Sequence, residues 1–197
     1  RSSTLGFDAE TGAVQDAAKA DDCEHSFLSD DEASFILRQV PPRRIFVVGG
    51  VHITQFLAPM ARQAGYDVTI IDPREVFSTA ERFPGSACLT AWPDEAMEGL
   101  RPDARTAVVT LTHDPKIDDP GLVEALRSDA FYIGCLGSRR THAARCERLA
   151  EAGFSAGDLA RLYGPAGLDI GAKTPAEIAV SILAQMIDVE RRRPAAS

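Results

Sequence analysis

The strongest constraint on the fold is an apolar, β-branched run that ends in two glycines and is followed at once by a segment with helical spacing. Residues 43–48 read Arg-Arg-Ile-Phe-Val-Val and precede Gly49-Gly50. From His52 to Ala64 apolar residues recur every three or four positions, and a second β-branched run follows at 66–71. This spacing predicts a strand, a crossover helix and a second strand parallel to the first.

The same alternation continues to the end of the chain. Apolar runs predict further strands at 107–112 and 131–136, and helical spacing predicts helices at 119–127, 138–152 and 155–162. Thr174-Pro175-Ala176-Glu177 has the form of a capping box with proline in the first turn, so a last helix is expected from there towards Arg191. The alternation predicts an α/β fold with a three-layer, Rossmann-like, doubly wound and mostly parallel sheet.

The first part of the chain has a different composition. Residues 1–33 are rich in Asp, Ala, Ser and Gly and lack periodicity, and residues 1–39 carry nine acidic against three basic side chains. Such a composition is typical of segments that bury little apolar surface. We therefore expect an acidic linker or disordered tail at 1–34, a short edge strand at 34–40 and a Rossmann-like domain at 35–193.

Composition also excludes several classes of protein. No apolar run among the 197 residues approaches the roughly 18 that a membrane span requires. The net charge of −8 argues against nucleic acid binding through overall charge. The four cysteines form no CxxC pair, which favours neither zinc nor a disulfide framework, and the start of the chain shows no export signal. We expect a cytoplasmic protein.

Open parallel sheets bind ligands at the carboxyl ends of their strands, so the residues after each predicted strand form the candidate site. They combine glycines, a hydroxyl, imidazoles, carboxylates and guanidiniums, and a glycine-rich segment at 164–171 adds one more acid. The candidates for cofactor binding are Gly49, Gly50, His52, Asp72, Arg74, His113, Asp114, Gly134, Gly137, Ser138, Arg139, Arg140 and Asp169. No catalytic residue and no metal ligand is assigned.

The first glycine pair permits two interpretations. Asp72 follows Gly49 by 23 positions, close to the spacing of an acid that binds a ribose hydroxyl in dinucleotide-binding domains. A GxGxxG fingerprint from Gly49 would need glycine where this chain has Val51 and Thr54, so close approach of a pyrophosphate is obstructed. A tight turn without a ligand is the alternative.

The segment Gly137-Ser138-Arg139-Arg140 is the best local signal for a phosphate site, because a strand leads directly into a helix with free N–H groups and two guanidiniums. His52 could help to hold an anion or lie at the surface. His113 with Asp114 suits a polar heterocycle or acid–base work. Asp114 could equally cap a helix, and for Asp118 a cap is the favoured interpretation. For Arg145 and Arg148 a solvated helix face is the favoured interpretation, Cys135 reads as a packing residue, and Glu177 as part of the capping box.

Taken as a set, the motifs resemble the Rossmann-like domain of the XdhC/CoxI family, the accessory proteins of xanthine dehydrogenase, carbon monoxide dehydrogenase and related molybdenum hydroxylases. The resemblance covers about residues 35–190. Gly-Gly-Val-His at 49–52 looks closer to the CoxI branch. The motifs are Val47-Val48-Gly49-Gly50-Val51-His52-Ile53, Ile71-Asp72-Pro73-Arg74, Glu81-Arg82-Phe83-Pro84, Thr112-His113-Asp114, Tyr132-Ile133-Gly134, Leu136-Gly137-Ser138-Arg139-Arg140, Gly167-Leu168-Asp169-Ile170-Gly171 and Thr174-Pro175-Ala176-Glu177-Ile178-Ala179.

The resemblance implies a maturation chaperone that binds the molybdenum cofactor, as molybdopterin or its cytosine dinucleotide, and delivers it to an apo molybdenum hydroxylase. It further implies a cofactor sulfurase as a second partner, and we expect a homodimer. Two alternatives remain: an NAD(P)-dependent oxidoreductase, and a non-catalytic Rossmann-like interaction module. Family members often carry a smaller domain ahead of this one with a cysteine in a glycine-rich context, which Cys23 in Asp-Asp-Cys-Glu-His does not match.

Overall fold

A computed structural model of the chain describes residues 3–8, 11, 14–16, 27–28, 34–39 and 42–193. The chain divides into two compact units, one up to Pro42 and one from Arg43 to Arg193. The domain bounds expected from the sequence, 35–193, stay a prediction. Over the described residues, no helix has the length and apolar character that crossing a membrane requires.

The first unit contains a small antiparallel sheet. Its strands are β1 (Ser3–Asp8), β2 (Val14–Asp16), β3 (Phe27–Leu28) and β4 (Ser34–Gln39), in the order β2-β1-β4-β3. The sequence predicted a linker or tail at 1–34, where the structure has β1, β2 and β3. It also predicted an edge strand at 34–40, whereas β4 lies between β1 and β3. The pairing sets Leu5 opposite Leu37 and Phe7 opposite Phe35. β1 has only Leu5 and Phe7 at a spacing of two, and the apolar residues 35–37 of β4 are consecutive, so the period-2 signal is too weak to detect locally.

The second unit is built on a six-stranded sheet in which every pairing is parallel. Its order is β10-β9-β8-β5-β6-β7, which is the strand order of Rossmann folds, with the chain reversing direction across the sheet between β5 and β8. The strands are β5 (Arg43–Val48), β6 (Tyr66–Ile71), β7 (Ala87–Leu89), β8 (Thr106–Thr110), β9 (Tyr132–Cys135) and β10 (Leu162–Tyr163).

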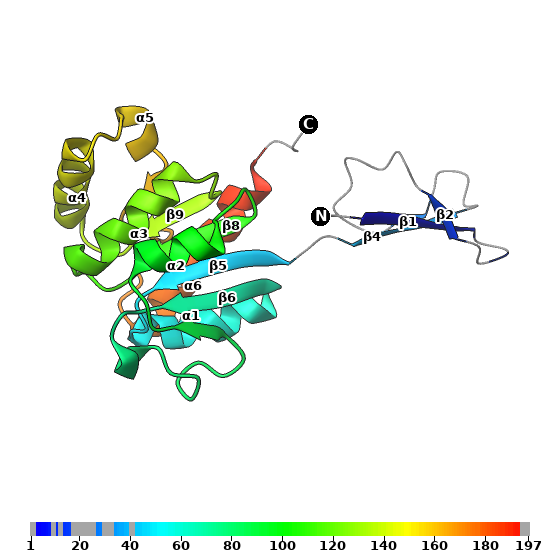
Figure 1. Cartoon of the computed structure of the whole chain (residues 1–197), viewed down its shortest axis with the longest axis horizontal. Helices are drawn as coiled ribbons and strands as arrows, with labels where there is room; N and C mark the ends of the chain where they lie inside the picture. The colour runs from blue at the N-terminus through cyan, green and yellow to red at the C-terminus, as the bar shows by residue number, and fades with distance from the viewer. Residues whose placement is uncertain are drawn as a thin grey trace. The chain divides into compact units, whose positions relative to one another are not determined.

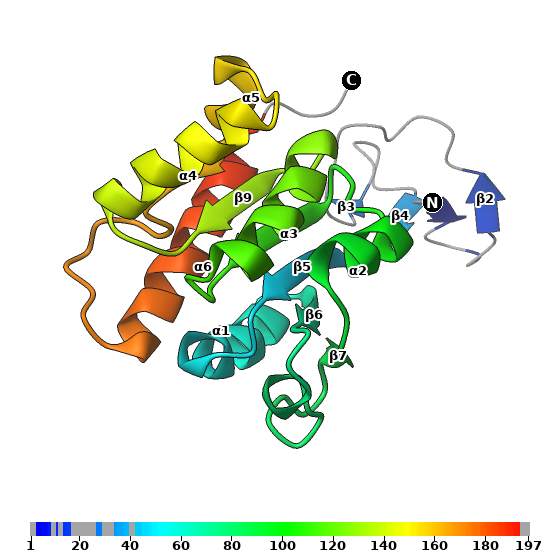
Figure 2. The same cartoon turned by 60° about the vertical axis from the view of Figure 1, so that its left-hand side comes forward.

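Helices cover both faces of this sheet. They are α1 (His52–Gln63), the 3-10 turn η1 (Glu75–Phe77), α2 (Pro93–Leu100), α3 (Pro115–Arg127), α4 (Arg139–Glu151), α5 (Ala156–Leu159) and α6 (Pro175–Arg191). Figures 1 and 2 show α1 and α6 on one face and α2 and α3 on the other. Alternate strand residues supply the two cores: Ile45 and Val47 face the first pair of helices, and Phe46 and Val48 the second. The predicted three-layer, doubly wound α/β fold is confirmed.

The long elements agree with the sequence predictions and the short ones do not. β5, β6, α1 and α6 begin and end close to the expected residues. β7 and β10 have only three and two residues, so their sequence pattern is too short to recognise. The helix expected at 155–162 is limited to α5, after which the chain enters β10. α2 was missed, although Pro93 with two acids after it is a helix start signal.

Candidate functional site

The loops that follow β5, β6, β8 and β9 lie at the carboxyl edge of the parallel sheet, as the sequence predicted. Twelve of the thirteen candidate residues lie in these loops, in the adjoining helix ends or in the segment before α6. The exception is Gly134, which lies inside β9. A Cβ atom there would come within 2.6 Å of the Tyr132 ring, so packing explains this glycine.

Asp72 organises what we call the closed side of this edge, formed by Gly49, Gly50, Asp72 and Arg74. Its side chain is completely buried and each oxygen accepts two hydrogen bonds. Oδ2 accepts from Gly50 N at 2.9 Å and from Arg74 Nη2 at 2.8 Å, and Oδ1 accepts from Arg74 N at 3.0 Å and Arg74 Nε at 2.8 Å. The carboxylate is thus fully used inside the protein, and no lone pair is left for a ribose hydroxyl.

Electrostatics keeps Asp72 ionised. Burial acts to raise the pKa of Asp72, but the hydrogen bonds from Arg74 and Gly50 outweigh burial and hold the pKa below its ordinary value. The same hydrogen bond raises the pKa of Arg74, whose guanidinium also stacks over the Phe77 ring at 4.2 Å. Arg74 therefore serves first as the partner of Asp72.

The two glycines after β5 are required by neighbouring protein atoms. A Cβ at Gly50 would lie 1.8 Å from the Phe77 carbonyl oxygen, and a Cβ at Gly49 would lie 2.6 Å from Thr112 Cγ2. Gly49 also has φ +106°, which side chains disfavour. The loops after β5 and β8 thus touch where the chain order reverses. This geometry favours the tight-turn interpretation over a pyrophosphate held against this backbone. His52 follows as an exposed residue in the first turn of α1.

The loop after β8 presents His113 and Asp114 at the surface. His113 has a positive φ of 64°, unusual for a residue other than glycine. Asp114 is the N-cap of α3 and accepts from Lys116 N at 3.0 Å. Asp118, for which a capping role was favoured, instead lies buried and accepts from Thr112 N, Thr112 Oγ1 and His113 N at 3.2, 2.7 and 3.1 Å. That expectation was wrong because the residue points back to the loop.

The loop after β9 forms the open side of the edge, Gly137–Arg140. Ser138 caps α4, since its Oγ accepts from Thr141 N at 3.1 Å. Arg139 and Arg140 are exposed in the first turn, which contains no acidic residue. A helix start with free N–H groups and two guanidiniums attracts anions.

A cavity of about 430 Å³ opens beside this loop. Three of the candidate residues line it, Gly137, Arg139 and Asp169, and its wall includes the segment before α6. Its volume lies in the range of small-molecule sites. The lining residues are Leu136, Gly137, Arg139, Pro165, Ala166, Gly167, Leu168, Asp169, Ile170, Gly171, Ala172, Ile178 and Ser181.

The segment 164–171 is held in place by α6. Gly167 N donates to Gln185 Oε1 at 2.8 Å, Leu168 N donates to Ser181 O at 3.1 Å, and Tyr132 Oη donates to the same Gln185 oxygen at 2.6 Å. A Cβ at Gly167 would lie 2.2 Å from Ser181 Oγ. Gly167 thus lets the segment approach its own helix closely, while Asp169 remains exposed.

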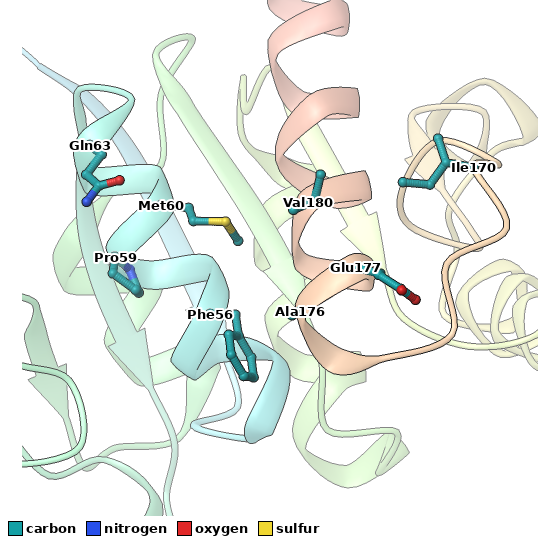
Figure 3. A pocket seen from close by; sticks show the side chains of 8 residues that line it. All are labelled: Phe56, Pro59, Met60, Gln63, Ile170, Ala176, Glu177 and Val180. Carbon is teal, nitrogen blue, oxygen red and sulfur yellow. The ribbon is translucent and has the colours of Figure 1, made fainter.

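An apolar pocket of about 460 Å³ lies between α1 and α6. Figure 3 shows Phe56 and Met60 of α1 and Val180 of α6 bordering the space between the two helices, with Ile170 on the loop beyond. Ile170 also lines the cavity at Gly137, so the two hollows adjoin. The structure exposes 44% of Phe56.

Arg145 and Arg148 of α4 were expected to lie on a solvated helix face, and the structure places them differently. Arg145 is 2% exposed and lies near Asp118, with Nη2 at 3.8 Å from Oδ2. Arg148 is partly exposed and pairs with Asp119 through two bonds of 2.6 and 3.0 Å. The interpretation was wrong for Arg145, because the helix turn that carries it faces the sheet. Leu149 lies four positions after Arg145, hence on the same helix face, and this spacing is the signal that could have raised this possibility.

No cluster of three or more potential metal ligands occurs in the described part of the chain. Cys88, Cys135 and Cys146 are free thiols. Burial raises the pKa of Cys135 to about 12, so this thiol is protonated at neutral pH and fits the packing role predicted for it.

Strand order and edge loops together define a Rossmann-like domain, with a cavity at the carboxyl edge of its sheet. The sequence profile of the family described as the XdhC Rossmann domain matches residues 45–186. The chain belongs to this family, which confirms the resemblance seen in the motifs; the placement in the CoxI branch stays a prediction.

Three known proteins are similar to this chain. The molybdenum cofactor insertion chaperone PaoD of Escherichia coli is 32% identical over 149 residues, 76% of this chain and 41% of that protein. A Bacillus subtilis protein named as a probable xanthine dehydrogenase subunit is 31% identical over 159 residues, 80% of this chain and 46% of that protein. A crystal structure described as a xanthine dehydrogenase from Bacillus halodurans shares the fold, with a TM-score of 0.76, 24% identity, and coverage of 100% of this chain and 62% of that one. The chain thus spans less than half the length of these two curated relatives.

Proposed function

We propose that this chain binds the molybdenum cofactor, as molybdopterin or its cytosine dinucleotide, and delivers it to an apo molybdenum hydroxylase such as xanthine or carbon monoxide dehydrogenase. The names of two relatives support this role: one is called a molybdenum cofactor insertion chaperone and the other a probable component of xanthine dehydrogenase. Under this proposal the cofactor is cargo, and the chain needs no catalytic residue.

The observation that carries the proposal is the cavity beside the open side. It joins the start of α4 and the Arg139 side chain to the exposed Asp169 on the facing segment. The N–H groups and guanidiniums at Gly137–Arg140 suit the phosphate or pyrophosphate of the cofactor. His113 and Asp114, exposed on the neighbouring loop, offer donors and acceptors for a pterin ring.

No feature of the described residues favours an NAD(P)-dependent oxidoreductase. A standard dinucleotide mode needs a free acid near the end of β6 and a backbone open to the pyrophosphate. Here Asp72 already accepts four hydrogen bonds, and Gly50 faces the Phe77 carbonyl oxygen. Protein atoms thus occupy both of the positions that a dinucleotide would need.

The partners follow from the same proposal. A chaperone of this kind would bind the apo hydroxylase and a cofactor sulfurase, and would act in the cytoplasm; a homodimer is our proposal for its assembly. Co-purification of the chain with an apo hydroxylase, but not with the cofactor-loaded enzyme, would support delivery. Equal binding of both forms would count against it.

Anaerobic calorimetric titration tests the cargo. We expect saturable micromolar binding of isolated molybdenum cofactor and none of NAD, NADP or CTP, and loss of binding in Arg139→Ala/Arg140→Ala. Arg127→Ala is the matched control, because Arg127 is an exposed arginine in the last turn of α3, at the opposite edge of the sheet. Binding of NAD or NADP alone would favour the oxidoreductase, and silence from every ligand would favour an interaction module.

A further inference from the structure

Beneath the exposed loops after β8 and β9 lies a buried pair of opposite charges. Asp118 on α3 is 1% exposed and Arg145 on α4 is 2% exposed. Their closest atoms, Oδ2 and Nη2, are 3.8 Å apart, too far for a hydrogen bond. Burial of two charges with such a loose mutual contact is unfavourable unless each group makes other bonds.

Asp118 holds the loop after β8. Its Oδ1 accepts from Thr112 N at 3.2 Å and Thr112 Oγ1 at 2.7 Å, and its Oδ2 accepts from His113 N at 3.1 Å. These bonds fix His113 in its left-handed conformation, φ 64°, which a histidine would not hold without support. Burial raises the pKa of Asp118, and the bonds from Thr112 together with Arg145 oppose that rise.

Arg145 holds the loop after β9. Its Nη2 donates to Leu136 O at 3.0 Å, and Leu136 directly precedes the Gly137–Arg140 segment. Nε and Nη1 have no hydrogen-bond partner among the described residues. The guanidinium thus makes its hydrogen bond through Nη2, and the Asp118 carboxylate at 3.8 Å offsets its charge.

One pair of residues thus contacts both loops. The strands that lead into them are neighbours, with Thr110 opposite Cys135, so the two loops leave the sheet side by side. We propose that Asp118 and Arg145 are positioning residues that hold these loops at a fixed spacing for a ligand that spans them, with an anionic group at Gly137–Arg140 joined to a polar heterocycle at His113. This inference rests on the proposed function, because the proposed cargo is such a ligand.

The same two helices provide a matched control. Asp119 and Arg148, one and three residues further along, form an ion pair with side chains 21% and 38% exposed. Neither contacts the loops through the bonds described here, since Arg148 bonds Asp119 and Ala144 O. Asp119→Asn and Arg148→Gln therefore change charge and the α3–α4 contact without touching the loops.

Hydrogen–deuterium exchange of the whole chain tests the coupling without any ligand. Arg145→Met should speed amide exchange about tenfold or more both at 136–141 and at 111–114, and Asp118→Asn, which keeps the side-chain shape, should do the same. The control variants should leave both segments within about twofold of the native chain. If each substitution affects only the loop it bonds, the coupling is wrong. If Arg145→Met does not fold, the response of 136–141 in Asp118→Asn decides.

Ligand affinity then separates positioning from general damage. Asp118→Asn should weaken binding of isolated molybdenum cofactor about tenfold and leave binding of inorganic pyrophosphate, which needs one loop only, within about twofold. Equal loss for both probes, or for neither, would overturn the positioning role. If the native chain binds no cofactor, the proposed function fails, and the exchange experiment still decides whether the loops are coupled.

Discussion

The closed side and the open side of the sheet edge both combine glycine with arginine after a strand, but they differ in where the N–H donors point. On the closed side, Gly50 and Arg74 give their N–H groups to Asp72, which is completely buried. On the open side, the start of α4 has one serine cap, and Arg139 and Arg140 extend to the surface without an acid in the first turn. Glycine and arginine after a strand therefore do not by themselves indicate a ligand site; the deciding feature is whether an internal carboxylate already uses their donors.

The difference predicts where substitutions act. Residues of the closed side should affect the free energy of unfolding, because their partners are protein atoms. The two arginines of the open side should affect ligand binding and leave unfolding almost unchanged. Free energies of unfolding measured in urea, together with ligand titrations, test whether the two sides differ in this way.

The largest effect is expected for Gly50→Ala. The new methyl would lie 1.8 Å from the Phe77 carbonyl oxygen, so the backbone of one loop must move, and we expect a loss of about 3 kcal/mol or more. Gly99→Ala is the control, since a Cβ at Gly99 in α2 meets nothing within 4 Å and alanine favours a helix by about 0.5–1 kcal/mol. Equal stability of the Gly50 variant and the native chain in urea would mean that this side is not closed.

Asp72→Asn comes next, with an expected loss of about 2–3 kcal/mol near neutral pH, because charged hydrogen bonds to Gly50 and Arg74 are removed. The effect depends on pH. The pKa of Asp72 is lower in the folded than in the unfolded chain, so its stabilisation is present above the unfolded pKa and is lost as the pH falls through the folded value. Native and variant stabilities should therefore converge in acid, and parallel curves would contradict this role of the carboxylate.

The sequence was sufficient for the fold of the second unit because its signals are local. The β-branched run at 43–48, the helical spacing of α1 and the capping box of Thr174 and Glu177 each specify an element within a few residues, and the structure has all of them. Their alternation then leaves few topologies, and it places the loops at one edge.

The placement of the candidate residues at the sheet edge was predictable, whereas their hydrogen-bond partners were not. Spacing located Asp72 and Gly50 correctly, but spacing cannot tell that the carboxylate faces Arg74 and the glycine instead of a ligand. Asp118 and Arg145 were read as a cap and a solvated residue, since their meeting depends on how α3 packs beside α4. Which donors are already used is a tertiary property, and helix periodicity does not contain it.

Ser138→Ala tests the border between the two sides. Its Oγ caps α4 through Thr141 N and belongs to the open loop, so we expect a loss of about 1 kcal/mol in the free energy of unfolding. Ser138→Thr, which retains a capping hydroxyl, should lose only a fraction of that amount. Urea curves for both variants check the order, and a loss as large as that of Asp72→Asn would place this loop with the closed side.

The smallest effect on unfolding is expected for Arg140→Ala. This variant therefore tests most directly whether the open side is separate from the closed side. Arg140 is exposed, and removing an exposed side chain without a buried partner changes stability by no more than about 0.5 kcal/mol. Arg74→Ala is its counterpart on the closed side: this guanidinium is also partly exposed, yet its loss leaves the buried Asp72 without two donors, and we expect a cost of about 1–3 kcal/mol. Cofactor titration should reverse the order, with binding weakened in Arg140→Ala and retained in Arg74→Ala. If both arginines changed stability and binding alike, the edge would be one continuous site, and the division into a closed and an open side would have to be abandoned.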